Sequence, residues 1–191
     1  INACQAWNIS QGANINVAVI DQGIDKTHND LSANIHSLSY NTETNSSPSQ
    51  LLGHHGTHCA GTIAAIKDNN LQVVGVAPQS KLMAISHPLS ITPNISAELA
   101  SGFGWAWQNG ADIISNSWGD WDPNGSNLGS PLLENSIIDA ITLGRNNKGC
   151  IVVFATGNEG TLKGLYKNYE GNIFAKTGTL SNHVGLSGYL I

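Results

Sequence analysis

Positive charge and cysteine are both scarce in this sequence. Lysine and arginine together number 8, against 13 acidic residues, which gives a formal net charge of −5 and leaves no basic cluster. Nucleic-acid binding needs such a cluster to neutralise phosphates, so we expect no nucleic-acid partner. The 3 cysteines, Cys4, Cys59 and Cys150, can form at most one internal disulfide. The chain is therefore not a disulfide-stabilised scaffold, and we expect buried free thiols.

Long apolar runs and a leader pattern are missing as well. No run approaches the roughly 20 residues that span a bilayer, so we expect no membrane partner. The chain opens in sequence typical of a folded domain, and we expect no signal peptide in it. With 191 residues, 40% of them hydrophobic and only 11% charged, the chain can bury one substantial core. The oligomeric state stays open.

Apolar segments of strand length alternate with segments of helical periodicity. Strands are expected at 15–21, 73–76, 81–86, 112–118 and 150–155, and helices at 57–66, 95–109 and 131–146. Ser96 is the expected N-cap of the second helix. This alternation predicts an α/β fold in which a mostly parallel sheet carries helices on both faces.

The character of the sequence changes after Gly160. Residues 172–180 and 184–191 have the composition of two strands joined by a short connection. Such a pair predicts a C-terminal antiparallel hairpin. We therefore expect a main domain over residues 1–160 and a C-terminal segment over residues 161–191.

Asp21 ends the first apolar run, and the chain turns two residues later at Gly23. Functional sites in open α/β sheets gather at the carboxyl ends of strands. A buried carboxylate there needs a partner, and a histidine would serve, with its tautomer fixed by the carboxylate. An ordinary aspartate that caps a loop is the alternative.

A histidine cluster opens the small-residue helix that follows. His55 is followed by Gly56, so its ring can face a cleft, and His54 and His58 lie one helical turn apart, as metal ligands can. No His-Glu-x-x-His pattern exists, and no other Cys/His/carboxylate cluster has ligand spacing, so we do not expect metal catalysis. Core histidines are the alternative.

Residues 156–160, Thr-Gly-Asn-Glu-Gly, follow the last apolar strand of the main domain. The side-chain amide of Asn158 can donate to a developing oxyanion, and losing one such donor typically costs about 3 kcal/mol of transition-state stabilisation. A plain turn is the alternative, because Gly-Asn-Glu-Gly favours one.

Taken together and in this order, these segments resemble the subtilisin-like serine proteases, the subtilases, over residues 1 to about 160. The resemblance implies an incomplete subtilisin-like fold and peptide-bond hydrolysis by acyl transfer. Asp21 would be the catalytic acid, His55 the base and Asn158 the oxyanion donor. It also implies protein or peptide substrates and a secreted or extracytoplasmic location.

The same resemblance assigns further residues to binding. The substrate would contact Ser115, Asn116, Ser117, Trp118, Gly119, Ala155, Thr156 and Gly157, and residues 84–88 would form the opposite edge. Cys59 follows the histidine motif as it does in the proteinase K-like and kexin-like branches. Asp30 and Asn69 would help bind a structural calcium ion. No cofactor is required for the chemistry.

The nucleophilic serine of that family lies in the pattern Gly-Thr-Ser-x-Ala, and this pattern is missing from the sequence. Gly-Thr begins at positions 56, 61, 160 and 178, and serine follows none of them. The nearest approach places Ser181 one residue out of register, in the expected hairpin. We therefore expect this chain alone to be inactive, since a nucleophile must meet its base in defined geometry. A non-catalytic peptide-binding module with a subtilase cleft is the alternative.

Residues 160–191 resemble a different family. Segments 160–163, 175–179 and 186–189 are similar to the Lys-Thr-Gly region of D-alanyl-D-alanine carboxypeptidases, which are penicillin-binding proteins. That chemistry needs Ser-x-x-Lys, and no lysine here has serine three residues before it. A fusion of two coding segments near residues 157–160 and a plain edge hairpin are both compatible with this tail.

Overall fold

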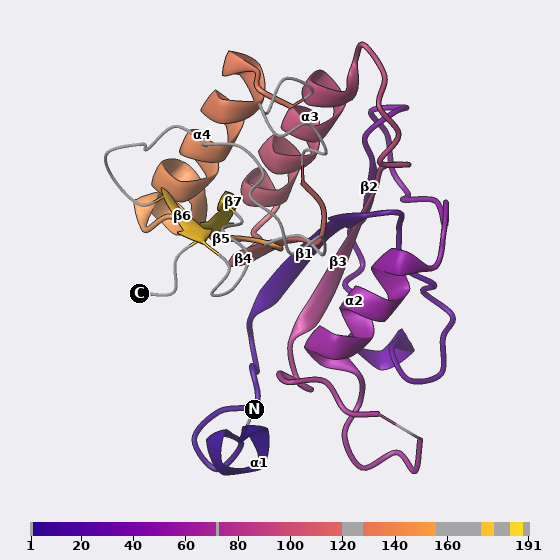
Figure 1. Ribbon diagram of the computed structural model, residues 1–191. Coiled ribbons are helices and arrows are strands. Elements are labelled where there is room, and N and C mark those ends of the chain that lie inside the picture. Colours follow the sequence, from indigo (N-terminus) through magenta and orange to yellow (C-terminus); the bar gives the residue numbers. More distant parts are fainter. Residues whose placement is uncertain (1, 72, 120–127, 156–172, 178–183, 189–191) are drawn as a thin grey trace.

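The computed structural model describes residues 2–71, 73–119, 128–155, 173–177 and 184–188, the last two segments as backbone only (Figure 1). The elements are α1 (Ala3–Ala6), β1 (Asn16–Asp21), the 3-10 helix η1 (Ser32–Asn34), β2 (Tyr40–Asn41), α2 (His55–Ala64), β3 (Lys81–Ser86), α3 (Ile95–Gln108), β4 (Ile113–Asn116), α4 (Pro131–Asn147), β5 (Ile151–Phe154), β6 (Ile173–Thr177) and β7 (Val184–Gly188).

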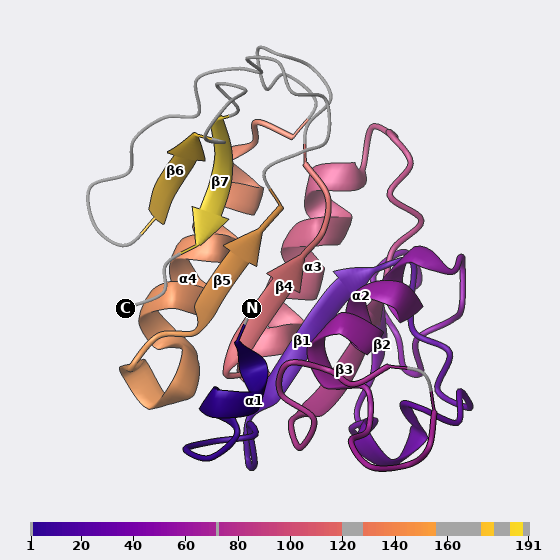
Figure 2. The ribbon, with the colours of Figure 1, turned by 60° about the horizontal axis from the view of Figure 1, so that its bottom comes forward.

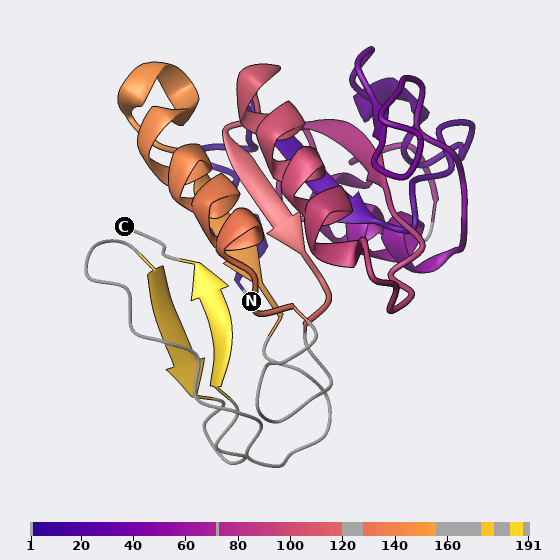
Figure 3. The same ribbon diagram turned by 90° about the horizontal axis from the view of Figure 1, so that it is seen from above.

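Five strands form one parallel sheet in the order β2-β3-β1-β4-β5. Figure 2 shows α2 on the near side of this sheet and α3 and α4 on the far side, and Figure 3 shows the same two helices from above. β6 and β7 pair as an antiparallel hairpin, and β7 lies beside β5. The expected α/β fold is confirmed.

The side chains of β1 alternate between the two helical layers. Val17 and Val19 pack in the cluster that contains α2, whereas Ala18 and Ile20 pack in the cluster that contains α3 and α4. Successive side chains of a strand point to opposite faces. Asp21, the next residue, therefore faces the side of α2.

The order of the strands explains why this end of β1 is a site. From β1 the chain forms β2 and β3 on one side of it and then crosses to form β4 and β5 on the other side. Such a reversal leaves the carboxyl end of the central strand between diverging connections, where ligands bind in open α/β sheets.

The strand expected at 73–76 is not formed. Backbone N–H groups of residues 75–77 donate instead to the carbonyls of Ala65, Thr62 and Ile63, at 2.9, 3.0 and 2.8 Å. These carbonyls lie at the C-terminal end of α2, where the last carbonyl groups of a helix have no hydrogen-bond partner within the helix. A Cβ at Gly75 would lie 2.4 Å from the helix backbone. The apolar segment thus caps a helix at close range.

Other boundaries also differ from expectation. α3 has Asn94 rather than Ser96 at its N-cap, without a side-chain cap bond. The helix expected at 57–66 begins earlier, at His55, and ends at Ala64. α1 and β2, with 4 and 2 residues, are too short to produce a periodic pattern.

The three cysteines are free, but they are not all buried as expected. Cys150 is buried and its thiol donates to the carbonyl of Ala111 at 3.0 Å, Cys59 is half-buried and Cys4 is exposed. Cys4 lies on α1, which has no buried residue. Within the described part of the chain, no helix combines the length and apolar character that crossing a membrane requires.

Candidate active site

Two glycines allow the start of α2 to pack against the end of β1. Gly23 turns the chain with φ +87°, and a Cβ there would lie 2.0 Å from the carbonyl oxygen of Gln50. A Cβ at Gly56 would lie 2.3 Å from the carbonyl oxygen of Gly23 and 3.0 Å from the Cβ of Asp21. A side chain at Gly56 would push the helix away from the strand, and one at Gly23 would displace the segment at Gln50.

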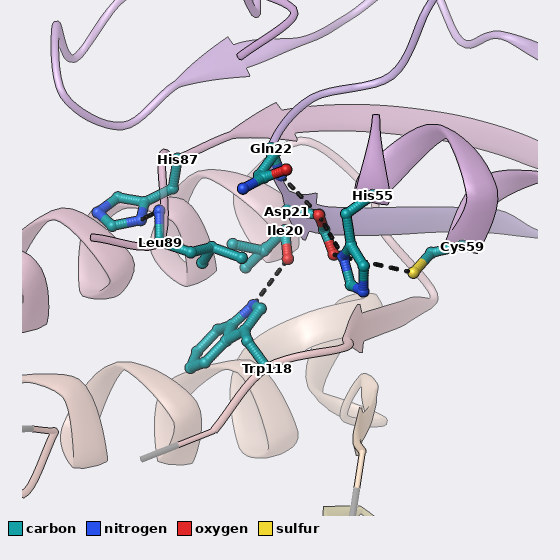
Figure 4. Close-up of polar contacts among 8 residues, drawn as sticks. All are labelled: Ile20, Asp21, Gln22, His55, Cys59, His87, Leu89 and Trp118. Carbon is teal, nitrogen blue, oxygen red and sulfur yellow. Dashed lines mark hydrogen bonds and ion pairs between the residues drawn. The ribbon is translucent and has the colours of Figure 1, made fainter. Parts of the chain in front are cut away.

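His55 and Asp21 meet at this contact (Figure 4). Nδ1 of His55 lies 2.9 Å from both carboxylate oxygens of Asp21, and Oδ1 also accepts from the backbone N–H of Gln22 at 2.7 Å. The side chain of Asp21 is fully buried, whereas that of His55 is 51% exposed. The positive end of α2 and these donors compensate the buried carboxylate.

The pairing determines which nitrogen of His55 is free. A carboxylate only accepts, so Nδ1 carries the proton and donates it to Asp21. In a neutral imidazole the other nitrogen, Nε2, is then an acceptor. An acceptor nitrogen on a half-exposed ring that a buried carboxylate holds in place can take a proton from an approaching hydroxyl.

Thr57 ties the turn after β1 to the first turn of α2. Its Oγ1 accepts from the backbone N–H of Asp25 at 2.9 Å. Asp25 in turn accepts from the N–H and hydroxyl of Thr27, at 2.9 and 2.7 Å, and these bonds lower the pKa of its carboxyl group. The residues on both sides of the Asp21–His55 contact are therefore fixed by their own hydrogen bonds.

The segment after β4 runs beside the same end of β1. Trp118 donates from Nε1 to the carbonyl of Ile20 at 2.7 Å (Figure 4). Its ring packs edge-on against Phe154 and Phe103, with centroids 5.3 and 6.5 Å apart. Trp118 is thus a structural link between the β4 and β1 ends, on the face of α3 and α4.

The other predicted substrate residues divide between the sheet and its edge. Ser115 pairs with Val19 of β1, within the sheet. Asn116 is buried, donates to the carbonyl of Val153 at 3.1 Å, and has no partner for Oδ1 among the described residues. Ala155 donates its N–H to the carbonyl of Asn116 at 2.9 Å. Gly119 is exposed, and no described residue lies within 4 Å of a Cβ placed on it.

Cys59 completes a cluster with the acid–base pair. It lies one helical turn after His55, and its sulfur is 3.9 Å from Nδ1. Burial raises the pKa of the Cys59 thiol, as does the nearby charge of Asp21, while a hydrogen bond with Ser117 lowers it. One donor atom each from Asp21, His55 and Cys59 lie within 4.8 Å of one another.

This convergence corrects the expectation that no Cys/His/carboxylate cluster has ligand spacing. The i, i+4 relation of His55 and Cys59 was visible in the sequence, but Asp21 joins them only through packing of α2 on β1. The exposed His54 and His58 are not part of the cluster.

Asp30 and Asn69 are also brought together. Nδ2 of Asn69 donates to Oδ1 of the buried Asp30 at 2.6 Å, and the amide oxygen accepts from the N–H of Leu71 at 3.1 Å. Carboxylate and amide oxygens are ligands that calcium takes, but calcium needs 6–8 oxygens. The amide group would have to turn over to present its oxygen beside the carboxylate.

A second histidine–carboxylate pair was not predicted. His87 follows β3 and is fully buried. Its Nδ1 accepts from the N–H of Leu89 at 2.8 Å, so Nε2 carries the proton and donates to Oε2 of Glu98 at 3.0 Å. Its own N–H donates to the carbonyl of Asp21 at 2.8 Å. Nothing in the spacing of His87 and Glu98 marks them as partners.

Four predicted positions lie outside the described residues. They are Thr156, Gly157 and Asn158, assigned to substrate and oxyanion binding, and Ser181, the nearest approach to a nucleophile.

Comparison with known proteins gives a consistent result. The sequence model of the Subtilase family matches residues 12–185. The calcium-dependent protease of Nostoc sp. is 35% identical over 184 residues, which cover 88% of this chain and 27% of that protein. Thermitase of Thermoactinomyces vulgaris is 31% identical over 182 residues, covering 95% of this chain and 61% of that protein.

A solved structure agrees with these relatives. The crystal structure of fervidolysin from Fervidobacterium pennivorans, described as a keratinolytic enzyme related to subtilisin, superposes with a TM-score of 0.65 at 33% identity. The superposition covers 81% of this chain and 23% of fervidolysin. The chain thus spans less than two thirds of each of these relatives.

The family match continues past residue 160, through residue 185. It therefore includes most of the C-terminal segment that was set apart by its sequence. The resemblance of that segment to D-alanyl-D-alanine carboxypeptidases is not shown by these comparisons.

Proposed function

The chain belongs to the subtilase family of serine proteases, and we propose that it supplies the acid and base of a peptide-hydrolysing site. His55 is the general base and Asp21 is the residue that orients it. The observation that carries the proposal is the contact of Nδ1 with both oxygens of a fully buried carboxylate, at 2.9 Å. It fixes the tautomer and stabilises the imidazolium that forms when the base takes a proton.

The proposed reaction is acyl transfer on protein or peptide substrates. A serine hydroxyl attacks the scissile carbonyl and its proton passes to Nε2 of His55. Asn158 and a backbone N–H would donate hydrogen bonds to the resulting oxyanion. Such electrostatic stabilisation is usually the largest single contribution to lowering the barrier. On family grounds we also propose a secreted or extracytoplasmic location.

The serine must come from outside the 191 residues, because no Gly-Thr-Ser occurs among them. Members of a triad act as a unit, so the loss of the serine alone removes nearly all activity. We therefore propose that this chain alone does not hydrolyse peptides.

A fluorophosphonate probe and a fluorogenic peptide test this directly. We expect neither labelling nor turnover by the 191-residue chain, with thermitase as the positive control. Labelling of any serine in this chain that disappears in the His55→Ala variant would contradict the missing nucleophile while supporting the role of the base. Labelling or turnover that persists unchanged in His55→Ala would contradict the proposed role of His55.

The same missing serine leaves peptide binding without turnover as a second candidate function. The acid–base pair and the link from Trp118 to β1 are both formed without it. Calorimetry with unstructured peptides distinguishes the two cases, since a binding module gives measurable heat and a catalytic fragment without affinity gives none.

We further propose that Asp30 and Asn69 help hold a stabilising calcium ion, with carbonyl groups and water completing its shell. The buried carboxylate of Asp30 supports this, and one relative is named a calcium-dependent protease. Calcium should raise the unfolding temperature relative to a chelator in the unmodified chain and not in Asp30→Asn. Equal unfolding temperatures with and without calcium in the unmodified chain would contradict it.

A further inference from the structure

A carboxylate, an imidazole and a thiol converge at the carboxyl end of β1. Nδ1 of His55 is 2.9 Å from Asp21 and 3.9 Å from the sulfur of Cys59, and one donor atom from each residue falls within a 4.8 Å set. Among the described residues, Asp21, His55 and Cys59 are the group of at least three histidine, cysteine and carboxylate side chains whose donor atoms all lie within 4.8 Å of one another. Figure 4 shows the three side chains pointing toward one another.

The separations approach those of a tetrahedral zinc site. Zinc bonds of about 2.0–2.3 Å to nitrogen, oxygen and sulfur place the donor atoms roughly 3.3–3.8 Å apart in a tetrahedron. A small widening of the Asp21–His55 contact and a small rotation of Cys59 toward His55 would reach this geometry. Three protein ligands leave the fourth tetrahedral position to water.

We propose that Asp21, His55 and Cys59 form a binding site for Zn²⁺ or a similar divalent transition metal such as Co²⁺ or Cd²⁺. A thiolate and an imidazole favour these borderline ions, whereas calcium and magnesium require oxygen ligands. The site is therefore distinct in chemistry and position from the Asp30–Asn69 pair.

Metal binding would remove the acid–base pair. Zinc at Nδ1 takes the place of the proton that His55 donates to Asp21, and the ring takes up a proton at Nε2 instead. The thiol of Cys59 loses its proton as well, so one proton net passes to the solvent. With Nδ1 bound to metal, the neutral ring carries its proton on Nε2, which becomes a donor. Nε2 can then no longer accept a proton from a nucleophile. The metal would act as an off-switch for the base.

Zinc titration of the reduced 191-residue chain by calorimetry tests the site. We expect one zinc per chain with net release of one proton, measured from the dependence of the heat on the buffer. Cys59→Ser should weaken the affinity by more than about 100-fold, the upper end of losses seen for outer-shell partners. The matched controls Cys4→Ser, an exposed cysteine, and His58→Ala, an exposed histidine of the same helix, should bind as the unmodified chain does.

Two readouts do not depend on the variants folding. The Co²⁺ complex of the unmodified chain should show a thiolate-to-cobalt charge-transfer band, and zinc should protect Cys59, but not Cys4, from alkylation in a peptide map. No binding, binding that survives in Cys59→Ser, or binding lost in Cys4→Ser or His58→Ala would contradict the proposal. If added calcium displaces the bound cation as effectively as added zinc does, this would contradict the proposal too.

Discussion

Two histidine–carboxylate pairs lie at the ends of neighbouring strands, on opposite faces of one sheet. His55 contacts Asp21 on the face of α2, and His87 contacts Glu98 on the face of α3. In the first pair the carboxylate is buried and the histidine is 51% exposed; in the second the histidine is fully buried and Glu98 is 21% exposed.

The difference lies in the second nitrogen of each ring. His87 uses both nitrogens, one as acceptor from Leu89 and one as donor to Glu98. His55 uses Nδ1 for Asp21, and Nε2 of its half-exposed ring has no hydrogen-bond partner among the described residues. The same two residue types therefore fix a chain segment in one place and leave a usable base in the other. A histidine beside a carboxylate is a candidate catalytic group only when one of its nitrogens is still free.

Replacing each histidine by alanine should separate the two pairs most strongly. His87→Ala removes a fully buried side chain and leaves the N–H of Leu89 without its acceptor, so we expect a loss of about 2–5 kcal/mol of unfolding free energy. His55→Ala should cost less, because water can enter the half-exposed space it leaves and solvate the carboxylate of Asp21, which keeps the backbone N–H of Gln22 as a donor. Chemical denaturation of both variants measures the difference; equal losses would contradict the structural role assigned to His87.

Gly56→Ala should disturb only the pair on the face of α2. The added Cβ would meet the carbonyl oxygen of Gly23 at 2.3 Å, so α2 must shift away from β1. We expect a loss of about 1–3 kcal/mol of unfolding free energy, the usual cost of overpacking. Denaturation curves for this variant give the value.

Gly61→Ala is the matched control on the same helix, because nothing lies within 4 Å of its added Cβ. It should stabilise the chain by about 0.5–1 kcal/mol through helix propensity alone. Equal effects of the two substitutions would contradict the close packing described for Gly56.

Trp118→Phe tests the link between the β4 end and β1. The variant keeps an aromatic ring near Phe103 and Phe154 but loses the donor to the carbonyl of Ile20, so we expect a loss of about 1 kcal/mol. Calorimetric unfolding measures this. Unchanged stability would mean that water replaces the bond at no cost.

The rate of alkylation of Cys59 should rise at higher pH than that of an ordinary thiol. Burial raises the pKa of its thiol, so less thiolate is present at any given pH, and its reaction with iodoacetamide should keep accelerating above about pH 8.5, the ordinary thiol value. Peptide mapping separates it from Cys150, whose pKa burial raises to about 11. A rate that levels off below about pH 8.5 would contradict the raised pKa.

Local sequence patterns predicted the two segments that carry Asp21 and His55, but they missed the contacts that come from distant segments. The apolar run before Asp21 and the glycine after it predict a strand that delivers a carboxylate, and the small residues after His55 predict a closely packed helix. Both signals are contained in short stretches of chain. The hairpin of β6 and β7 was predicted in the same way.

Partners from distant segments could not be read in this way. Glu98 reaches His87 because α3 packs on one face of β3, and Ser117 reaches Cys59 because alternation along the β4 segment turns it toward α2. Each contact depends on register and packing between elements. Residues 73–76 show the converse, since an apolar stretch typical of a strand caps the end of α2 instead.

His55 holds its proton on Nδ1, toward Asp21, while His87 holds its proton on Nε2, toward Glu98. A long-range ¹H–¹⁵N spectrum of the histidine rings, near neutral pH and without metal, reports both tautomers at once. We expect opposite tautomers for the two rings, and we expect the proton of His55 to move to Nε2 in Asp21→Asn, where the amide of asparagine can donate to Nδ1. A proton on Nε2 of His55 in the unmodified chain would contradict the tautomer assigned to the acid–base pair.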